Sequence, residues 1–319
     1  MAQPELTPHS ALLEEVEEAI IILFCVVDDA YRILNPKAEH YESLKQLSDS
    51  EVITLALLQQ LRGVESERSF LGDVERFFSH LFPGVVGLWP SSLHRRIRKL
   101  RHFLETLRRS VLAELVGDPE TMIVDSTLLS VLHPRQVRQS AGWGSHSAGA
   151  AWVRWGTFSV YGVKLHLLCS TNRVPLSYEL TPANVAEVSL TEELLAEAKL
   201  GDGVARKLLG DLAYRSGELE EELAEVGIML LSSEARARRP GVRQQIEICF
   251  STLKRIFGLE ETLATTLVGL ATRIAAKMTA YTYAFLSSTG CWVVLKAESR
   301  SYGHEPDNRH LVLCHTLVE

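Results

Sequence analysis

The stretch Gly241–Phe257, GVRQQIEICFSTLKRIF, decides the fold of the second half of the chain. Its apolar residues recur at steps of three and four positions, which predicts an amphipathic helix packed against a core. Beside them, Arg243, Glu247 and Lys254 lie four and seven positions apart, and at about 100° per residue they fall within roughly 40° of one another. The helix therefore holds a carboxylate at the edge of its buried face, between two cations.

A polar stripe of this kind has two interpretations. On its own it usually marks a solvent-exposed helix face with weak ion pairs four residues apart. It also suits a metal ligand placed beside groups that grip phosphates. Two further acids favour the second interpretation, because Asp125 and Asp211 each end a short apolar run upstream.

The composition is that of an ordinary globular protein. The chain has 319 residues, 46% hydrophobic and 23% charged, which is enough for two domains with good cores. It has no run of about 18 uncharged apolar residues and no basic leader segment, so we expect neither a membrane span nor a signal peptide. The five cysteines form no C-x-x-C pairs, which disfavours a zinc site and predicts a reducing, cytoplasmic location.

The net charge of −7 counts against nucleic-acid binding, which usually goes with a basic balance. The cations are nevertheless clustered. Residues 94–109 hold seven Lys or Arg against one acid, and residues 236–255 add six more. A molecule charged in this bipolar way can bind DNA with one face. The candidate DNA-contacting residues of the first cluster are Arg95, Arg96, Arg98 and Lys99.

The first 117 residues are predicted to be all helical. Ser48-Asp49-Ser50-Glu51 has the capping-box pattern, so a helix begins there and runs to Leu61. The other expected helices cover 9–30, 37–47, a stretch through Phe77-Phe78, and a long basic helix from Ser92 to Leu115. Short helices before a basic helix are compatible with a helix-turn-helix DNA reader, although this region alone favours a plain helical bundle.

A turn at Gly117-Asp118-Pro119 separates this domain from a second one that mixes strands and helices. The expected strands are 121–126, 157–170, 174–180, 207–211 and 227–231, with a long irregular stretch at 127–156 and helices at 181–200, 216–226, 241–257 and 263–286. This order predicts an α/β fold, a mixed sheet with helices on both faces. We expect domains at 1–117 and 118–288 and leave 289–319 unassigned.

Three acids are expected to converge in the second domain. Asp125 ends the first strand, Asp211 ends the fourth, and Glu247 lies on the helix after the fifth. Carboxylates gathered in one place repel unless metal ions neutralise them. Oxygen ligands of this kind suit Mg²⁺ or Mn²⁺, and two such ions can activate a nucleophile and stabilise a leaving oxygen in phosphoryl transfer.

The sequence resembles the DDE transposases of bacterial insertion sequences, which carry an RNase H-like catalytic domain. The resemblance covers roughly residues 65–287, and its motifs are specific in their order and spacing. They are SFLGDVERFF at 69–78, SLHRRIRKL at 92–100, IVDST around Asp125, YGVKLHLL at 161–168, LTPAN at 180–184, GDLAY at 210–214 and the R-x3-E-x6-K of Arg243, Glu247 and Lys254.

The resemblance implies DNA cleavage and strand transfer at the ends of a mobile element. Asp125, Asp211 and Glu247 match the family's metal ligands, for two Mg²⁺ or Mn²⁺ ions, and Arg243 and Lys254 match its phosphate-contacting cations. The implied partners are double-stranded DNA, namely terminal inverted repeats and target DNA, bound by a homodimer associated with the nucleoid.

The chain also departs from the family pattern. The tyrosine that a subgroup carries three residues before the arginine is replaced by Pro240, and the acidic or His-Asp pair after T-P-A-N is replaced by Ala186-Glu187. Trp143, Trp152 and Trp155 suit either a base-stacking role or cover for the core, and the second is favoured.

Three functions remain open from the sequence. The first is a metal-dependent transposase, favoured because all three acids are present. The second is a catalytically inactive or repurposed DNA-binding protein derived from one. The third is a nuclease of the RNase H type acting on RNA hybrids, which the basic helical N-terminal region disfavours.

Overall fold

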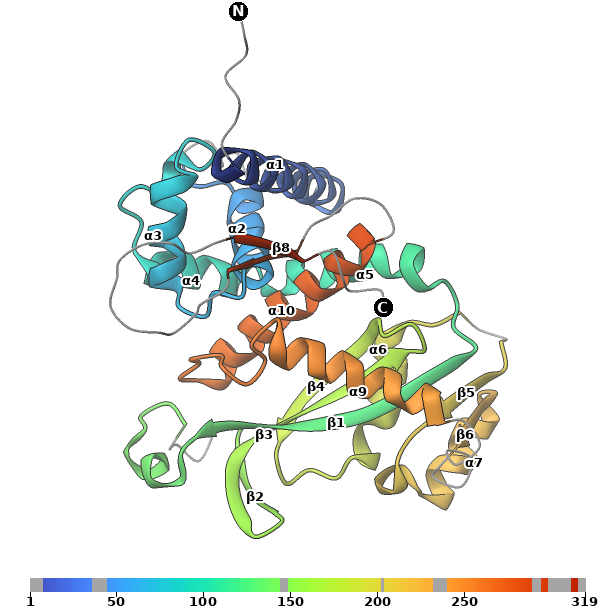
Figure 1. The fold of residues 1–319 in the computed structure, drawn as a ribbon. Helices are drawn as coiled ribbons and strands as arrows, with labels where there is room; N and C mark the ends of the chain where they lie inside the picture. The colour runs from blue at the N-terminus through green and yellow to red at the C-terminus, as the bar shows by residue number, and fades with distance from the viewer. Residues whose placement is uncertain are drawn as a thin grey trace, which may run out of the picture. The chain divides into compact units, whose positions relative to one another are not determined.

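The computed structural model describes residues 8–35, 45–143, 149–201, 204–231, 240–288, 294–297 and 311–314. The chain divides into two compact units (Figure 1). One consists of Met1–Ser110 together with Ala275–Glu319, and the other of Val111–Ile274. The sequence-based boundaries at 117 and 288 stay a prediction.

The first unit is built from helices. They are α1 (Pro8–Leu34), α2 (Asp49–Leu61), α3 (Glu67–Phe77), α4 (Pro90–Lys99), the first part of α5 (Arg101–Val116) and most of α10 (Leu267–Ser288), with the short 3-10 helix η2 (Pro83–Val85) and the antiparallel pair β7 (Val294–Ala297) and β8 (Leu311–Cys314). The helical N-terminal region expected from the sequence is therefore confirmed. Most of the expected helix at 37–47 and most of the tail after 288 lie outside the described residues.

Helix α2 forms much of the core of this unit. Ser50 and all residues from Val52 to Gln60 are buried, as expected for a helix that is largely apolar on every side. The predicted capping box is present, since the Ser48 hydroxyl accepts the Glu51 N–H at 3.1 Å and the Glu51 carboxylate accepts the Ser48 N–H at 2.6 Å. The expected start of this helix is therefore confirmed.

The single long basic helix expected at 92–115 is wrong in one respect. The structure breaks it at Leu100, where α4 ends and α5 begins. The Leu100 N–H is shared between the carbonyls of Arg96 and Ile97, which tightens the last turn. No Gly or Pro marks the break, and the apolar spacing continues across it, so sequence periodicity could not reveal it.

The second unit contains a six-stranded mixed sheet. Its strands are β1 (Thr121–Leu132), β2 (Ala151–Trp155), β3 (Phe158–Ser170), β4 (Pro175–Pro182), β5 (Arg206–Leu209) and β6 (Ile228–Leu231). Five of them follow the order β4-β3-β1-β5-β6, in which β4, β3 and β1 are antiparallel neighbours while β1, β5 and β6 run parallel. This arrangement is the RNase H-like sheet, so the predicted fold class is confirmed.

Helices cover both faces of the sheet (Figure 1). On one face a core that includes Met122 and Val124 packs with residues of α6 (Thr191–Ala198) and α7 (Gly217–Glu225). On the other face lies α9 (Pro240–Arg255), which packs against β1 and brings Cys249 against Cys169 of β3. Thus α9 is the amphipathic helix expected at 241–257.

Two expected boundaries in this unit are wrong. The stretch 127–156 is not irregular throughout, because β1 continues to Leu132, the 3-10 helix η3 (Pro134–Gln139) follows, and β2 adds a sixth strand on β3. The helix expected from 181 begins only at Thr191, because β4 keeps its pairing with β3 as far as Pro182. In both places strand pairing extends an element beyond its local sequence signal.

A glycine on β3 permits the close approach of β1. A Cβ atom at Gly162 would lie 2.2 Å from the Leu129 carbonyl oxygen, which belongs to the backbone and cannot move aside. Gly162 lies beside the bulge between Ser130 and Leu132, where the register of the β1–β3 pair shifts.

We therefore expect Gly162→Ala to lower the free energy of unfolding by roughly 1–3 kcal/mol, as overpacking against fixed atoms does. Urea denaturation followed by circular dichroism measures the change. The matched control is Gly217→Ala, where a Cβ has nothing within 4 Å, and it should leave the stability unchanged or slightly higher. Equal stabilities of the two variants would contradict the steric argument.

Candidate functional site

Asp125 lies on the side of the sheet that α9 covers. Side chains alternate along a strand, so Asp125 shares a side with Ile123, whose partner on β3 is Cys169. Cys169 in turn contacts Cys249 of α9. One carboxylate oxygen of Asp125 accepts the N–H of Ser126 at 2.8 Å, which orients the side chain along the strand.

Asp211 occupies the matching place on the neighbouring strand. The last residue pair in the parallel β1–β5 ladder is Ile123 with Leu209, and each aspartate stands two residues beyond it. The Asp211 carboxylate caps the 3-10 helix η5 (Leu212–Tyr214) by accepting the Ala213 N–H at 2.8 Å. Both acids therefore stand in register at one edge of the β1–β5 ladder, Asp211 after the end of β5 and Asp125 within β1. The expectation that Asp125 ends its strand is wrong, because pairing with β3 continues β1 to Leu132.

The pKa of a buried tyrosine is raised by the acids of this edge. Tyr214 is fully buried, and among the described residues its hydroxyl has no hydrogen-bond partner of normal geometry. Burial raises the pKa of Tyr214 most, and the negative charges of Asp125, Glu187 and Asp211 raise it further. The charges of both aspartates therefore act on the Tyr214 hydroxyl, which agrees with their matching places on β1 and β5.

Glu247 is not grouped with the two aspartates. Its side chain on α9 is 55% exposed and pairs with Arg243 Nε at 3.4 Å, one turn earlier on the same helix. Lys254 pairs with Glu260 at 2.7 Å. Among the described residues, no three His, Cys, Asp or Glu side chains stand close enough together to hold a metal ion. The structure thus aligns two of the three predicted acids and places the third on the helix that covers the same face.

Sequence reasoning did not single out a polar network that lies next to this edge. Lys164 Nζ on β3 donates to the Glu187 carboxylate and to the Val185 carbonyl, both at 2.7 Å. Two residues along β3, His166 Nε2 lies 2.8 Å from the Thr181 hydroxyl, while its Nδ1 is buried and has no hydrogen-bond partner in the described part of the chain. The sequence did contain a signal for this network. Lys164 and His166 fall on one side of a predicted strand, and Glu187 stands at the acidic position after T-P-A-N.

The cations of the N-terminal cluster divide into two kinds. Arg95, Arg98 and Lys99 are exposed, and Arg95 makes a 3.3 Å contact with the Ser92 hydroxyl. Arg96 instead reaches across to the start of α2, where it donates to the Leu47 carbonyl at 2.6 Å and to the Asp49 carboxylate. Arg96 is therefore part of the fold of this unit.

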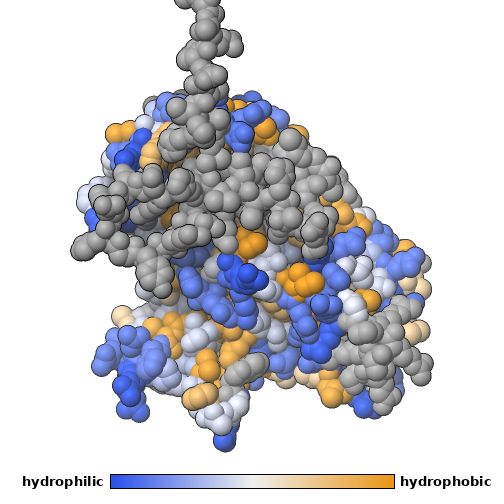
Figure 2. All heavy atoms as spheres, in the orientation of Figure 1, coloured by the Kyte–Doolittle hydropathy of each residue, from blue (hydrophilic) through white to orange (hydrophobic). Residues whose placement is uncertain are grey.

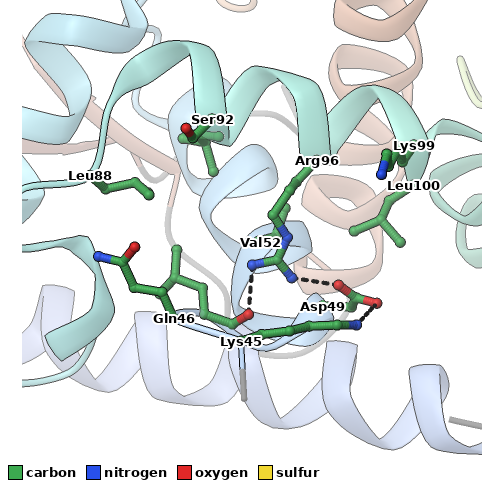
Figure 3. Close-up of a pocket in the computed structure, with 11 residues that line it drawn as sticks. Lys45, Gln46, Asp49, Val52, Leu88, Ser92, Arg96, Lys99 and Leu100 are labelled. Atoms are coloured by element: carbon green, nitrogen blue, oxygen red, sulfur yellow. Dashed lines mark hydrogen bonds and ion pairs between the residues drawn. The ribbon is translucent and has the colours of Figure 1, made fainter. Parts of the chain in front are cut away.

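Figure 3 shows the pocket beside Arg96. It has a volume of about 460 Å³ and a lining that mixes apolar with charged side chains. Lys45 and Arg96 both bind Asp49, and although burial works in the opposite direction, these partners and Tyr31 hold the pKa of the Asp49 carboxyl below its usual value. The charges in this pocket are thus largely satisfied within the protein.

Comparison with known families identifies the chain. Residues 117–283, just over half of its length, match the family described as the transposase DDE domain. The chain belongs to that family, and it is a transposase with a DDE domain.

Two solved structures share a distant likeness with it. One is described as a Mos1 transposase paired-end complex with the left transposon end, at 10% identity and a TM-score of 0.25, covering 77% of this chain and 80% of that one. The other is a pre-cleavage Mos1 transpososome, at 10% identity and a TM-score of 0.23, covering 78% and 80%. TM-scores this low support no conclusion.

Comparison with curated proteins gave no match. Among the described helices, none is both long and apolar enough to cross a membrane.

The buried histidine makes stability depend on pH. Burial, and next the charge of Lys164, lower the pKa of His166 from 6.5 to about 4, although Glu187 opposes the shift. Between those values the unfolded chain binds a proton that the folded protein excludes, so stability falls as the pH drops through this window.

We expect His166→Gln to remove up to about 3 kcal/mol of the stability difference between pH 7 and pH 4. Urea denaturation at half-unit pH steps measures it. Parallel pH curves for parent and His166→Gln would contradict the assignment.

Proposed function

We propose that this transposase is a metal-dependent enzyme that cleaves DNA at the ends of an insertion sequence and transfers the free 3′ ends to a target. One observation carries the proposal, the alignment of Asp125 and Asp211 two residues beyond the last pair of adjacent parallel strands. An RNase H-like sheet in a family of DDE transposases is the setting in which such a pair would act.

The two aspartates fit a divalent cation. Two neighbouring carboxylates repel each other, and the charges of both also raise the pKa of Tyr214. A cation of the Mg²⁺ or Mn²⁺ class would relieve this repulsion. Asp125 and Asp211 would hold it, and Glu247 would join them after leaving its ion pair with Arg243. When bound, such ions lower the pKa of an attacking hydroxyl and stabilise the leaving oxygen, and two ions suit both tasks.

The residues around the acids would then position the DNA. In this proposal Arg243, once freed from Glu247, and Lys254 neutralise phosphates next to the scissile bond, because both lie along the α9 stripe that carries Glu247. Exposed Arg95, Arg98 and Lys99 contact the backbone of the terminal repeats, while Arg96 supports the helix that presents them. Pairing of two element ends suits a homodimer on DNA acting in the cytoplasm at the nucleoid.

The competing function is a transposase-derived DNA-binding protein without catalysis. The exposed position of Glu247 and its ion pair with Arg243 are the observations that favour it. The two functions differ in one measurable respect, the metal-dependent cleavage of element-end DNA.

Glu247→Gln separates them. The substitution keeps the shape of the side chain and removes the charge that binds a cation, so cleavage of labelled element-end DNA in Mg²⁺ should fall by several orders of magnitude. Binding of the same DNA in EDTA should persist. The control is Glu225→Gln, an exposed acid on α7, which should cleave like the parent.

Lys254→Ala should act differently, with weaker DNA binding and a smaller reduction of cleavage, because it removes a phosphate-binding cation and leaves the carboxylates in place. A parent protein that binds the element ends but never cleaves them in Mg²⁺ or Mn²⁺ would support the competing function. Full activity of Glu247→Gln in a cleaving parent would remove Glu247 from the proposed metal ligands.

The N-terminal cluster yields a separate prediction. Replacing Arg95, Arg98 and Lys99 by Gln should lower the slope of log K against log salt by roughly 0.9 for each phosphate that the protein no longer neutralises. Fluorescence anisotropy with a labelled duplex measures it. Arg68→Gln, an exposed cation on α3, should leave the slope unchanged. An unaltered slope in the triple variant would show that this face is merely solvated.

A further inference from the structure

One long segment of this acidic protein contains no acid at all. The chain has 40 Asp and Glu among 319 residues, about one in eight, yet none occurs between Asp125 and Glu179. The same segment carries four arginines and a lysine. At the average frequency of this chain, a run of this length would hold about six or seven acids, so negative charge is depleted in one place.

The structure gathers part of this segment into one projection from the sheet. Strand β2 pairs with the first residues of β3, Phe158–Gly162, beyond the part of β3 that pairs with β4. The helix η3 packs against β3. We call η3 (Pro134–Gln139) and the β2–β3 hairpin (Ala151–Tyr161) the basic arm. Figure 2 has the orientation of Figure 1 and shows a group of hydrophilic residues at the lower left, where η3 lies. Hydrophobic residues lie next to this group, on the side of the β2–β3 hairpin.

The basic arm presents three guanidinium groups that no described residue neutralises. Arg135 and Arg138 on η3 and Arg154 on β2 are exposed, and within the described part of the chain none forms an ion pair. Elsewhere many cations are paired. Examples are Arg62 with Asp73, Arg108 with Glu105, Lys164 with Glu187, Arg206 with Asp118 and Lys277 with Glu65. The arm therefore keeps its positive charge available for a partner.

Aromatic groups accompany these cations on a firm support. Trp152 is 47% exposed and packs against Tyr161, with ring centroids 5.3 Å apart. The Tyr161 hydroxyl donates to the Trp143 carbonyl at 2.6 Å, and the buried Trp143 indole donates to the Ala264 carbonyl at 2.9 Å. Trp143 is thus cover for the core, as expected, while Trp152 is held at the surface. Phe158, at the start of β3, is 75% exposed.

Arg154 stands on the same face of the hairpin as Trp152, because the two residues are two apart on one strand. A cation beside a supported indole suits a sugar-phosphate chain, since the guanidinium binds a phosphate and the ring packs on the sugar or on an unpaired base. The indole is fixed before binding, so little of its side-chain freedom is given up when DNA is bound.

We propose that the basic arm is a DNA-binding surface of this transposase, which contacts the phosphate backbone through Arg135, Arg138 and Arg154 without reading sequence. This inference rests on the proposed function, because it assigns a DNA-binding surface to the sheet-containing unit that carries the proposed catalytic acids. It also accounts for DNA binding by a protein of net charge −7, since the arm is locally positive.

DNA suits the arm better than a second copy of the chain does. In a two-fold symmetric contact the same patch would face itself, and three unpaired guanidinium groups would meet three more. Burying unpaired like charges is costly, whereas phosphates supply the opposite charge and release counterions. The charge complementarity therefore selects a polyanion.

The test compares two double variants of the full-length protein that remove equal charge. Arg135→Gln with Arg154→Gln changes the arm. Lys199→Gln with Lys207→Gln changes exposed lysines near the other end of the sheet, where Lys207 is paired in register with the first residue of β1. Each variant is mixed with a labelled duplex of random sequence, about three helical turns long, in EDTA, and anisotropy is followed as the salt concentration is raised through roughly 0.05–0.2 M.

The arm variant should lower the slope of log K against log salt by about 1.8 and weaken binding at 0.1 M salt by more than about tenfold, while the control keeps the slope of the parent. Arg135→Lys with Arg154→Lys should restore most of the slope, because lysine returns the charge. Equal slopes for parent and arm variant would overturn the proposal.

Two further outcomes are decisive. If the arm variant keeps its DNA affinity but no longer forms a dimer seen for the parent by light scattering, the arm is an interface between copies and the proposal fails. Binding is measured without metal, so this test does not depend on cleavage. If the arm variant has a lower salt slope than the parent, the arm proposal is supported even when the parent does not cleave DNA. If the parent cleaves and the slope does not change, the arm alone fails.

Discussion

The site depends on a short stretch of parallel pairing between β1 and β5. The pairs Thr121–Lys207, Met122–Leu208 and Ile123–Leu209 join these strands, and they set where Asp125 and Asp211 stand relative to each other. A slip of one residue would turn every side chain on one strand to the opposite face and separate the two carboxylates. The burial of Met122 and Leu208 in the core on the α6 and α7 side opposes such a slip. The hydrophobic core thereby holds two like charges at the end of the β1–β5 ladder.

Many of the buried cations in this protein are neutralised by ion pairs. Buried cations such as Lys277 and Arg206 have carboxylate partners, which offset the cost of removing them from water. The same holds at the site, where Lys164 binds Glu187 beside the neutral His166. Against this background, the absence of ion pairs at Arg135, Arg138 and Arg154 among the described residues is notable, because the protein has enough acids to neutralise these arginines. Net charge alone conceals this difference, and a net charge of −7 is a poor guide to what one surface of the molecule can bind.

Much of the fold could be predicted from local sequence patterns. The capping box at Ser48 and the amphipathic spacing of α9 report short-range physics, and both appear in the structure as expected. The neighbouring positions of the strands that carry Asp125 and Asp211 fit the mixed sheet expected from the order of elements. The break at Leu100 did not, because no residue there disfavours a helix, and the tertiary environment alone decides it. Strand β2 was missed for a similar reason, since pairing with β3 makes a strand of a short segment that carries no clear alternation.

The site was predicted less completely than the fold. Residue type and position after short apolar runs led to Asp125 and Asp211 as candidates, although β1 does not end at Asp125 and continues to Leu132. The direction of a side chain on a helix surface could not be predicted in this way, because it depends on the neighbours of that side chain. Glu247 turns to Arg243, which the sequence also placed within reach. The contacts of Arg96 with Leu47 and Asp49 join residues far apart in the chain, so a basic run could not show which of its members the fold itself uses.

Helix α10 has a consequence for the order in which the protein is built. Its residues from Ala275 onward belong to the helical unit, where Lys277 binds Glu65 and the Thr279 hydroxyl donates to the Leu104 carbonyl at 3.1 Å. The helical unit is therefore interrupted in sequence by the whole of the sheet-containing unit. During synthesis the first helices of the helical unit leave the ribosome long before α10 does. The packing around Lys277 and Glu65 can therefore form only after α10 has been made. The sheet-containing unit, continuous in sequence, is the part of the nascent chain that can fold first, contrary to the usual order in which N-terminal domains lead.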